Sequence, residues 1–218
     1  MVSACLYSGI FLIYGQTLVK LVNYQIMDKE VIIAVAIGIG LSAASGFRVF
    51  VPMLAASIAA KAGIFPLNEG FQWLAGWPAL ITLSTATIVD IMAYYIPFID
   101  NLLDTITTPL AVGVGTLLLT SVLPVDNDLL KWITGFIFGG GSAAAIQGGT
   151  SLTRLASTKL TAGMGNAVVA TGENAAAVGT SVLSLVIPLI IAAVVIVVIT
   201  YLLMKFGKKL FGRKKEAA

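Results

Sequence analysis

The chain has 218 residues and a net charge of +3, with 58% hydrophobic residues, only 11% charged residues and a mean hydropathy of +1.00. About a quarter of the residues of a soluble domain are charged, so this composition argues against a soluble domain and indicates an integral membrane protein. Histidine is absent and Cys5 is the only cysteine, which excludes His/Cys zinc sites, His-ligated haem, disulfides within the chain and histidine-assisted nucleophiles; we therefore expect no enzyme and no cofactor.

Residues 1–27 form an apolar extension interrupted by Lys20. This start lacks a basic n-region and a cleavage pattern after an apolar core, so we do not expect a cleaved signal peptide. The extension is either an extra, poorer transmembrane helix or a segment packed at the surface. We divide the remaining chain into a membrane helical domain over residues 28–204 and a basic tail over 205–218.

Two short apolar segments, 31–45 and 47–62, come next and are separated around Gly46. Each is shorter than the roughly 20 apolar residues that cross a bilayer, which indicates a tight two-helix hairpin or a re-entrant element. Irregular backbone at membrane depth survives only when it is buried in protein or faces a water-filled cavity.

The segments 78–97 and 105–123 are predicted as further helices, and 130–147 and 148–162 as a second short pair broken at Gln147-Gly148-Gly149. Gly135 and Gly139 have a small-xxx-small spacing, which favours close helix packing over a glycine-lined pore. The linkers Ala62–Trp77 and Pro124–Leu130 both carry acids, and the first also carries Trp73 and Trp77 as interfacial anchors, so we place both linkers on the non-cytoplasmic side.

The apolar run 178–204 contains more residues than one crossing needs and predicts a spanning helix. A basic cluster follows it: Lys205, Lys208, Lys209, Arg213, Lys214 and Lys215. By the positive-inside rule this tail is cytoplasmic, and we expect it to touch anionic lipid rather than nucleic acid. The whole pattern predicts an all-α, multi-pass protein of the plasma or inner membrane, with about six or seven transmembrane or re-entrant helices.

The stretches 40–63 and 140–163 match at several positions at a constant offset of one hundred residues. Two interpretations stay open. Alanine richness alone generates some of the matches, whereas a true internal repeat would comprise residues 31–104 and 131–204, as in some transporter folds.

Charges within apolar segments supply the candidate functional residues. Asp90 lies in an uncharged run and must be paired, protonated or hydrated at membrane depth, so ion handling and a structural pair with Arg48 both stay open. Apolar neighbours leave Arg48 no polar face, which favours a buried partner. Asp100 and Asp104, at an i,i+4 spacing, either meet a cation or basic partner or cap the next helix.

Arg154 is a further candidate for pairing with a buried acid or for binding an anion. The stretch Gly163–Asn174 mixes Gly, Asn and Thr with one carboxylate, which predicts an irregular loop. In that loop Asn166, Glu173 and Asn174 either coordinate an ion through oxygens or belong to an ordinary turn.

Three motifs, GLSAASGFRVFVP, YYIPFIDNLLDTITTPLAV and GGTSLTRLASTKLTAGMGNAVVATGEN, resemble the bacterial membrane proteins grouped as domain-of-unknown-function family 4126. The resemblance covers residues 30–200 and implies a polytopic integral membrane protein, but no activity. The residues themselves suggest a transporter or channel for a small ion or solute, with a polar path between small-residue hairpins in a homo-oligomer. The alternative is a non-transporting scaffold or assembly subunit whose intramembrane charges form structural pairs. The expected partners are the bilayer and a small ion or anionic lipid headgroup.

Overall fold

The computed structural model describes residues 29–161 and 164–212, with side chains described except in 97–105, 202–203 and 205–212. This part of the chain is entirely helical and has no strand, so the all-α prediction is confirmed. The elements are a first helix over residues 29–44, α2 (Phe50–Lys61), the 3-10 helix η1 (Glu69–Ala75), α3 (Trp77–Ala93), α4 (Pro97–Thr120), α5 (Asp128–Thr134), the π-helix η2 (Gly135–Gly140), α6 (Gly141–Thr161), α7 (Asn166–Val186) and α8 (Pro188–Gly212).

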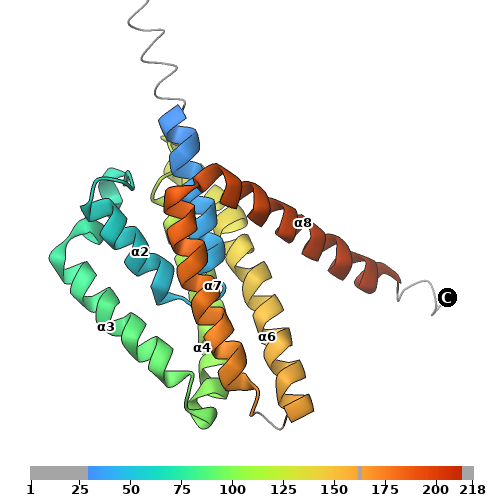
Figure 1. Ribbon diagram of the computed structural model, residues 1–218. Helices are drawn as coiled ribbons and strands as arrows, with labels where there is room; N and C mark the ends of the chain where they lie inside the picture. Colours follow the sequence, from blue (N-terminus) through green and yellow to red (C-terminus); the bar gives the residue numbers. More distant parts are fainter. Residues whose placement is uncertain (1–28, 162–163, 213–218) are drawn as a thin grey trace, which may run out of the picture.

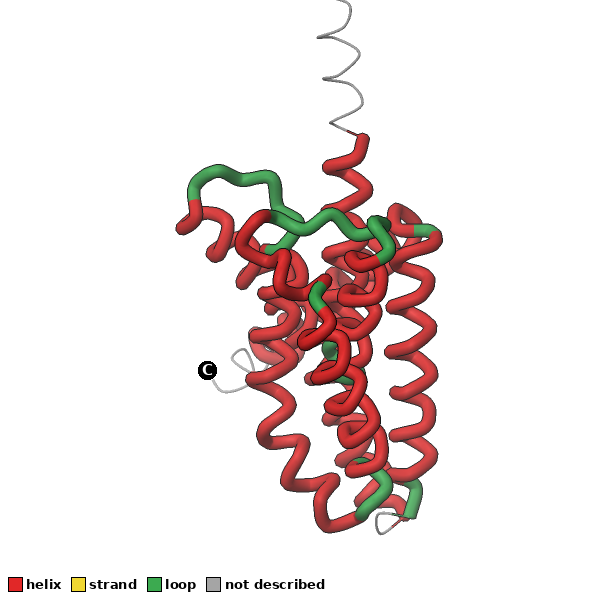
Figure 2. Tube along the Cα trace, turned by 90° about the vertical axis from the view of Figure 1, so that its left-hand side faces the viewer, coloured by secondary structure: helices red, strands yellow, loops and turns green. Residues whose placement is uncertain are grey.

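The long helical rods α4, the continuous α5–η2–α6 and α7 run along the bundle, and α3 lies at its edge and packs on α2 (Figures 1 and 2). The loops over 62–76 and 121–127 lie at one end, together with the start of the first helix and the α7–α8 junction. The α3–α4 and α6–α7 connections lie at the opposite end. Helix α8 leaves the bundle at an angle (Figure 1).

The first helix and α2 form a hairpin whose tip, residues 45–49, lies inside the bundle. Ser45 and Arg48 in this tip are buried. Gly46 packs so closely on α6 that a Cβ there would come 2.5 Å from the carbonyl oxygen of Ala143 and 2.6 Å from Cβ of Ile146. The predicted break at Ser45-Gly46 is therefore confirmed. The hairpin tip contacts α6 near the middle of the 34-residue helix 128–161.

The second predicted break does not exist. Residues 128–161 form one continuous helix through Gln147, Gly148 and Gly149. A helical glycine costs only about 1 kcal/mol relative to alanine, and packing against the hairpin tip outweighs that cost. Because 31–62 is a hairpin and 131–162 a single helix, the fold does not reproduce the internal repeat over these segments.

The run 178–204 is also divided, because α7 ends at Val186 and α8 begins at Pro188. Proline has no N–H to donate and its ring clashes with the preceding turn, so the apolar run changes direction there instead of forming one spanning helix. Among the described residues, one helix is long and apolar enough to cross a membrane, 128–161, or two if η1 and α3, which meet at a bend of 62°, act as one span.

Helix α4 and η2 pack backbone to backbone. A Cβ at Gly139 would overlap the carbonyl oxygen of Gly115, and a Cβ at Gly115 would overlap that of Gly139. The surrounding apolar core includes Leu41, Leu118 and Leu119, all nearly inaccessible. Gly135 and Gly139 therefore allow η2 to pack closely on α4 rather than line a pore.

Candidate functional site

Arg48 is the centre of a buried cluster of charges. It is only 2% exposed, because the hairpin tip carries it into the middle of the bundle. Its Nη2 donates a hydrogen bond to the carbonyl oxygen of Ala170 at 3.2 Å and lies 3.7 Å from Oε2 of Glu173. The prediction of a buried partner for Arg48 is confirmed, but that partner is Glu173 on α7.

Glu173 also binds Arg154, which projects from α6. Nε of Arg154 donates to Oε1 of Glu173 at 3.0 Å, and Nη2 of Arg154 donates to Oε2. Both residues are 5% exposed. This side-on, two-bond pairing is the strongest geometry available to a guanidinium and a carboxylate, and here one carboxylate serves two arginines.

Tyr94, at the end of α3, holds both guanidinium groups against its ring. Cζ of Arg48 lies 3.7 Å and Cζ of Arg154 lies 4.2 Å from the ring centroid, within cation–π range. The Tyr94 hydroxyl donates to Oγ1 of Thr107 at 3.1 Å, and Nε2 of Gln147 donates to the same oxygen at 3.4 Å. Sequence reasoning missed Tyr94, although it follows Asp90 by four positions and so shares its helical face.

Asp90 completes the cluster from α3 and is 6% exposed. It interacts electrostatically with Arg48 and Arg154, but no ion pair within 4.0 Å joins it to Arg48 among the described contacts. Its Oδ2 is buried without a hydrogen-bond partner in the described part of the chain. The cluster therefore contains two formal positive and two formal negative charges.

Arg48 also has hydrogen-bonding capacity left over. Its Nε and Nη1 are buried and donate to no atom of the described residues. Most buried polar atoms in proteins have a partner, and leaving a buried donor unsatisfied is costly. The unmatched donors of Arg48 and the unmatched acceptor of Asp90 distinguish this cluster from a fully satisfied structural network.

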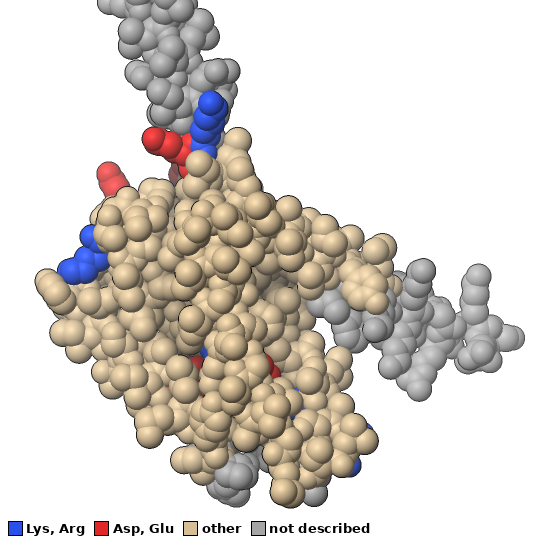
Figure 3. Space-filling model, in the orientation of Figure 1, with Lys and Arg blue, Asp and Glu red and all other residues tan. Residues whose placement is uncertain are grey.

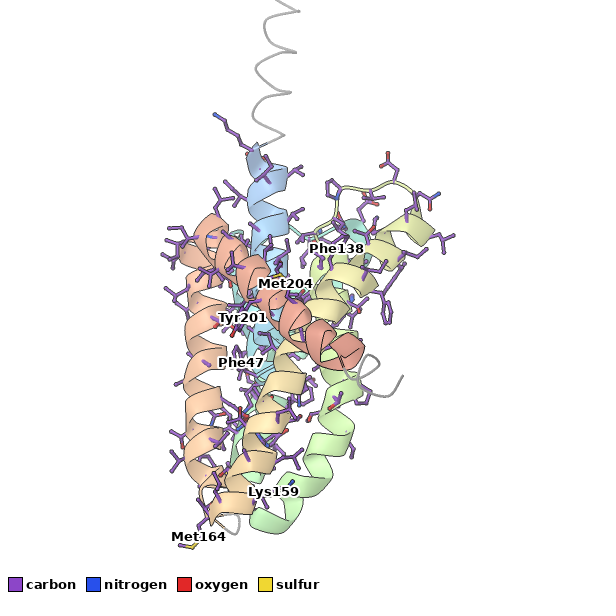
Figure 4. The ribbon with its side chains drawn as sticks, turned by 90° about the vertical axis from the view of Figure 1, so that its right-hand side faces the viewer. Phe47, Phe138, Lys159, Met164, Tyr201 and Met204 are labelled. Carbon is purple, nitrogen blue, oxygen red and sulfur yellow. The ribbon has the colours of Figure 1, made fainter. Side chains whose placement is uncertain are left out.

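A pocket of about 560 Å³ lies beside the cluster, between α6 and α7. Phe47 of the hairpin tip and Glu173 form part of its wall, and Thr150 and Thr153 add hydroxyls. The pocket exists because Gly149 and Gly172 both line it and a Cβ added at either would meet no atom within 4 Å. Figure 3 shows a little red and blue recessed in the middle of an otherwise tan face, and Figure 4 shows Phe47 at mid-height.

Asn166 and Asn174 make hydrogen bonds to residues outside the cluster. The predicted loop is wrong, because α7 already begins at Asn166 and an alanine-rich sequence continues it as helix. Asn166 exchanges hydrogen bonds with Thr158 at 3.1 and 3.3 Å, whereas Nδ2 of Asn174 donates to the Tyr95 hydroxyl at 3.3 Å. Asn166, Glu173 and Asn174 therefore make separate contacts rather than one shared ion site.

Asp100 and Asp104 belong to α4 by their backbone, and their side chains lie outside the described part. Among the described side chains, no group of three His, Cys, Asp or Glu residues is placed to hold a metal ion.

Comparison with known proteins identifies a family and no relative. No curated protein and no solved structure matches the chain. A family model described as a domain of unknown function (DUF4126) matches residues 35–208, which include the hairpin tip and both arginines and both acids of the cluster. The chain therefore belongs to the DUF4126 family.

Proposed function

We propose that the chain is a multi-pass protein of the plasma or inner membrane that moves a small ion or solute past the buried charge cluster. Membrane location is supported by the exposed side chains, since large apolar residues line the outer faces of α3, η2, α7 and α8. Soluble monomers rarely expose such continuous apolar surface. Figure 3 shows one face of the molecule as almost uniformly tan, with charged residues mainly near one end.

The distribution of the other charges supports the same proposal. Outside the cluster, the described charged side chains lie in end loops or near helix ends: Lys29, Glu30, Lys61, Glu69, Asp126, Asp128, Lys131 and Lys159. Lys61 also stacks on the ring of Trp77, with its Nζ 3.7 Å from the centroid, as an interfacial anchor would. In this arrangement α3, α4, α5–α6, α7 and α8 cross the bilayer and the hairpin is re-entrant.

One observation carries the transport proposal: Glu173 lines a pocket and lies 3.7 Å from Nη2 of Arg48, whose Nε and Nη1 have no hydrogen-bond partner among the described residues. Charged residues within membrane segments commonly mark ion and substrate paths. An entering ion or polar solute would meet the Thr150 and Thr153 hydroxyls first, then Glu173 and the arginines. The neutral cluster closes the path at rest, and the solute opens it by competing for Glu173.

The experiment fills the pocket without disturbing the bundle. Gly149→Leu and Gly172→Leu place a side chain in the pocket, and Gly148→Leu is the matched control because its Cβ also meets no atom within 4 Å but Gly148 does not line the pocket. Proteoliposomes carrying each protein would be tested for proton, chloride and potassium flux under imposed gradients. We expect both pocket variants to abolish flux that the control retains. Equal flux in all three would reject the pocket as the path.

A scaffold without transport is the second candidate, and the Arg154–Glu173 pair favours it. The pair satisfies both carboxylate oxygens and joins α6 to α7, as a purely structural contact would. In that case the wild-type protein carries no proton, chloride or potassium flux. Removing both charges with Arg154→Gln and Glu173→Gln would then change only the stability of the protein.

The proposed orientation has a cytoplasmic C-terminus, because the basic cluster after residue 204 follows the positive-inside rule. Fusion of a reporter that is active only in the cytoplasm to residue 218 would test it. A homo-oligomer is part of the proposal, because the outer apolar faces of α3 and α7 can pack on a second copy as well as on lipid. Mass measurement in mild detergent would give the number of copies.

A further inference from the structure

The two acids of the charge cluster differ in how fully they are bonded. Glu173 accepts a hydrogen bond from Arg154 at each carboxylate oxygen, and its Oε2 also lies 3.7 Å from Nη2 of Arg48. Asp90 has no ion pair within 4.0 Å among the described residues, and its buried Oδ2 accepts no hydrogen bond from them. A proton added to Glu173 would therefore disrupt two charge-assisted bonds, whereas a proton added to Oδ2 of Asp90 would disrupt no bond to a described residue.

The charge of Asp90 is controlled from within the cluster. The titratable and charged groups around it are Arg48 of the hairpin tip, Arg154 of α6, Glu173 of α7 and, one turn along its own helix α3, Tyr94. Helix α2 packs along α3, but its one charged residue, Lys61, stacks on the first residue of α3. That residue is about 20 Å from Asp90 along the helix axis.

The position of Asp90 favours a proton over a larger ion. Neither Asp90 nor Arg48 lines the pocket beside the cluster, so potassium or chloride in the pocket would meet Glu173 and not Asp90. A cation would also face the two arginines, and an anion would face the two acids. A proton needs only one free lone pair and a hydrogen-bonded route, and Oδ2 of Asp90 provides the lone pair.

We propose that the ion moved past the cluster is a proton and that Asp90 is the group that binds it. The carboxylate takes one proton from hydronium and becomes a neutral carboxyl group. It then returns that proton to water on the other side of the membrane, so only a proton is moved. This inference rests on the transport proposed above and names its ion.

Proton binding also explains how the hairpin tip is released. Once Asp90 is neutral, Arg48 and Arg154 share Glu173, the remaining described carboxylate of the cluster. Arg154 already holds both oxygens of Glu173, so Arg48 loses the greater part of its charge compensation. A buried arginine without that compensation is costly, and the tip that carries Arg48 loosens.

Infrared difference spectroscopy of the full chain in lipid vesicles detects a proton on Asp90 directly. Acidification should produce the C=O band of a buried carboxylic acid, and isotope-labelled aspartate should shift that band. The band should vanish in Asp90→Asn, which keeps the shape of the side chain, and persist in Asp126→Asn, which changes an acid of an end loop. In Asp90→Glu the band should respond to labelled glutamate instead. A wild type without this band, or a band that persists in Asp90→Asn, would overturn the proposal.

Proteoliposomes with a trapped pH-sensitive dye test the transport role. Under an imposed pH gradient, Asp90→Asn should abolish proton flux, Asp126→Asn should retain it in full and Asp90→Glu should retain part of it. Equal proton flux in the wild type and Asp90→Asn would overturn the proposal. Potassium or chloride flux without proton flux would overturn this inference alone and leave transport standing, whereas absence of all three fluxes would reject transport itself.

Hydrogen exchange of the hairpin tip tests its release without any flux measurement. At a pH where the infrared band shows Asp90 to be charged in the wild type, Asp90→Asn mimics the protonated form. The backbone amides of residues 45–49 should then exchange faster in Asp90→Asn than in the wild type or in Asp126→Asn. Equal exchange in all three proteins would overturn the release of the tip.

Discussion

The stretches 40–63 and 140–163 have similar compositions and different structures. The first turns back at residues 45–49, whereas the second is a straight part of α6 up to residue 161. The two cross where Gly46 packs on Ile146, positions that the hundred-residue offset makes equivalent. Similar small residues thus serve one stretch as a turn and the other as the surface on which that turn rests.

The paired serines show how the difference arises. Ser42 donates its hydroxyl to the carbonyl oxygen of Gly115 on α4 at 2.7 Å, whereas Ser142 donates to Gly139, three residues back in its own helical rod, at 2.8 Å. Ser45 reaches α4 as well, through the carbonyl oxygen of Ala111 at 3.2 Å. Ser42 and Ser45 therefore tie the hairpin to another helix, whereas Ser142 makes its hydrogen bond within its own helical rod.

The largest effect is expected at Glu173, the acid that pairs with Arg48 of the first stretch and with Arg154 of the second. Glu173→Gln removes the carboxylate that is ion-paired with both arginines and leaves only Asp90 to balance them among the described residues, so we expect a loss of about 3–5 kcal/mol in the free energy of unfolding. Denaturant unfolding in detergent measures it. Asp126→Asn in the exposed loop is the control. A loss no larger than that of the control would mean that Glu173 does not hold the arginines.

A side chain added at Gly46, where the two stretches cross, should destabilise the protein more than one added at Gly148 of α6. Gly46→Val brings a Cβ into the Ala143 carbonyl and the Ile146 side chain, and overpacking of this kind costs about 1–3 kcal/mol. Gly148→Val, two positions beyond Ile146 and in open space, should cost less. Thermal unfolding of the two variants compares them, and an equal effect would contradict the close contact at Gly46.

Tyr94 allows the cation–π contacts to be separated from the hydrogen bond. Tyr94→Leu removes the ring from both guanidinium groups and should cost about 1–2 kcal/mol. Tyr94→Phe keeps the ring and loses the bond to Thr107, which should cost about 1 kcal/mol. Chemical denaturation of both variants ranks them. If leucine and phenylalanine destabilise equally, the hydroxyl, which both variants lack, matters rather than the ring.

The smallest effect is expected where the hairpin ends. Gly63 has a φ of +74°, and a Cβ there meets no atom within 4 Å, so the backbone conformation alone penalises a side chain. Gly63→Ala should cost about 1 kcal/mol, and Gly63→Asn should cost less because asparagine tolerates the left-handed region. Equal melting temperatures for wild type and Gly63→Ala would show that this turn relaxes.

Sequence alone identified four of the five residues that form the charged cluster with its ring: Arg48, Asp90, Arg154 and Glu173. Isolated charges in apolar segments are recognisable without a structure, because burying them demands a partner. The pairing could not be derived in the same way. Glu173 is 125 positions from Arg48, and only the packing of α7 on the hairpin tip makes it the shared partner in place of Asp90.

Composition and local pattern determined the helical class, the membrane-like hydropathy, the break at Ser45-Gly46 and the family. These properties depend on residue type and short spacing. Tertiary structure decided that Gly148 and Gly149 continue a helix and that Tyr94 joins the charges. The physical reason is that glycine and alanine permit both a turn and a helix, so the neighbouring helices determine which of the two forms.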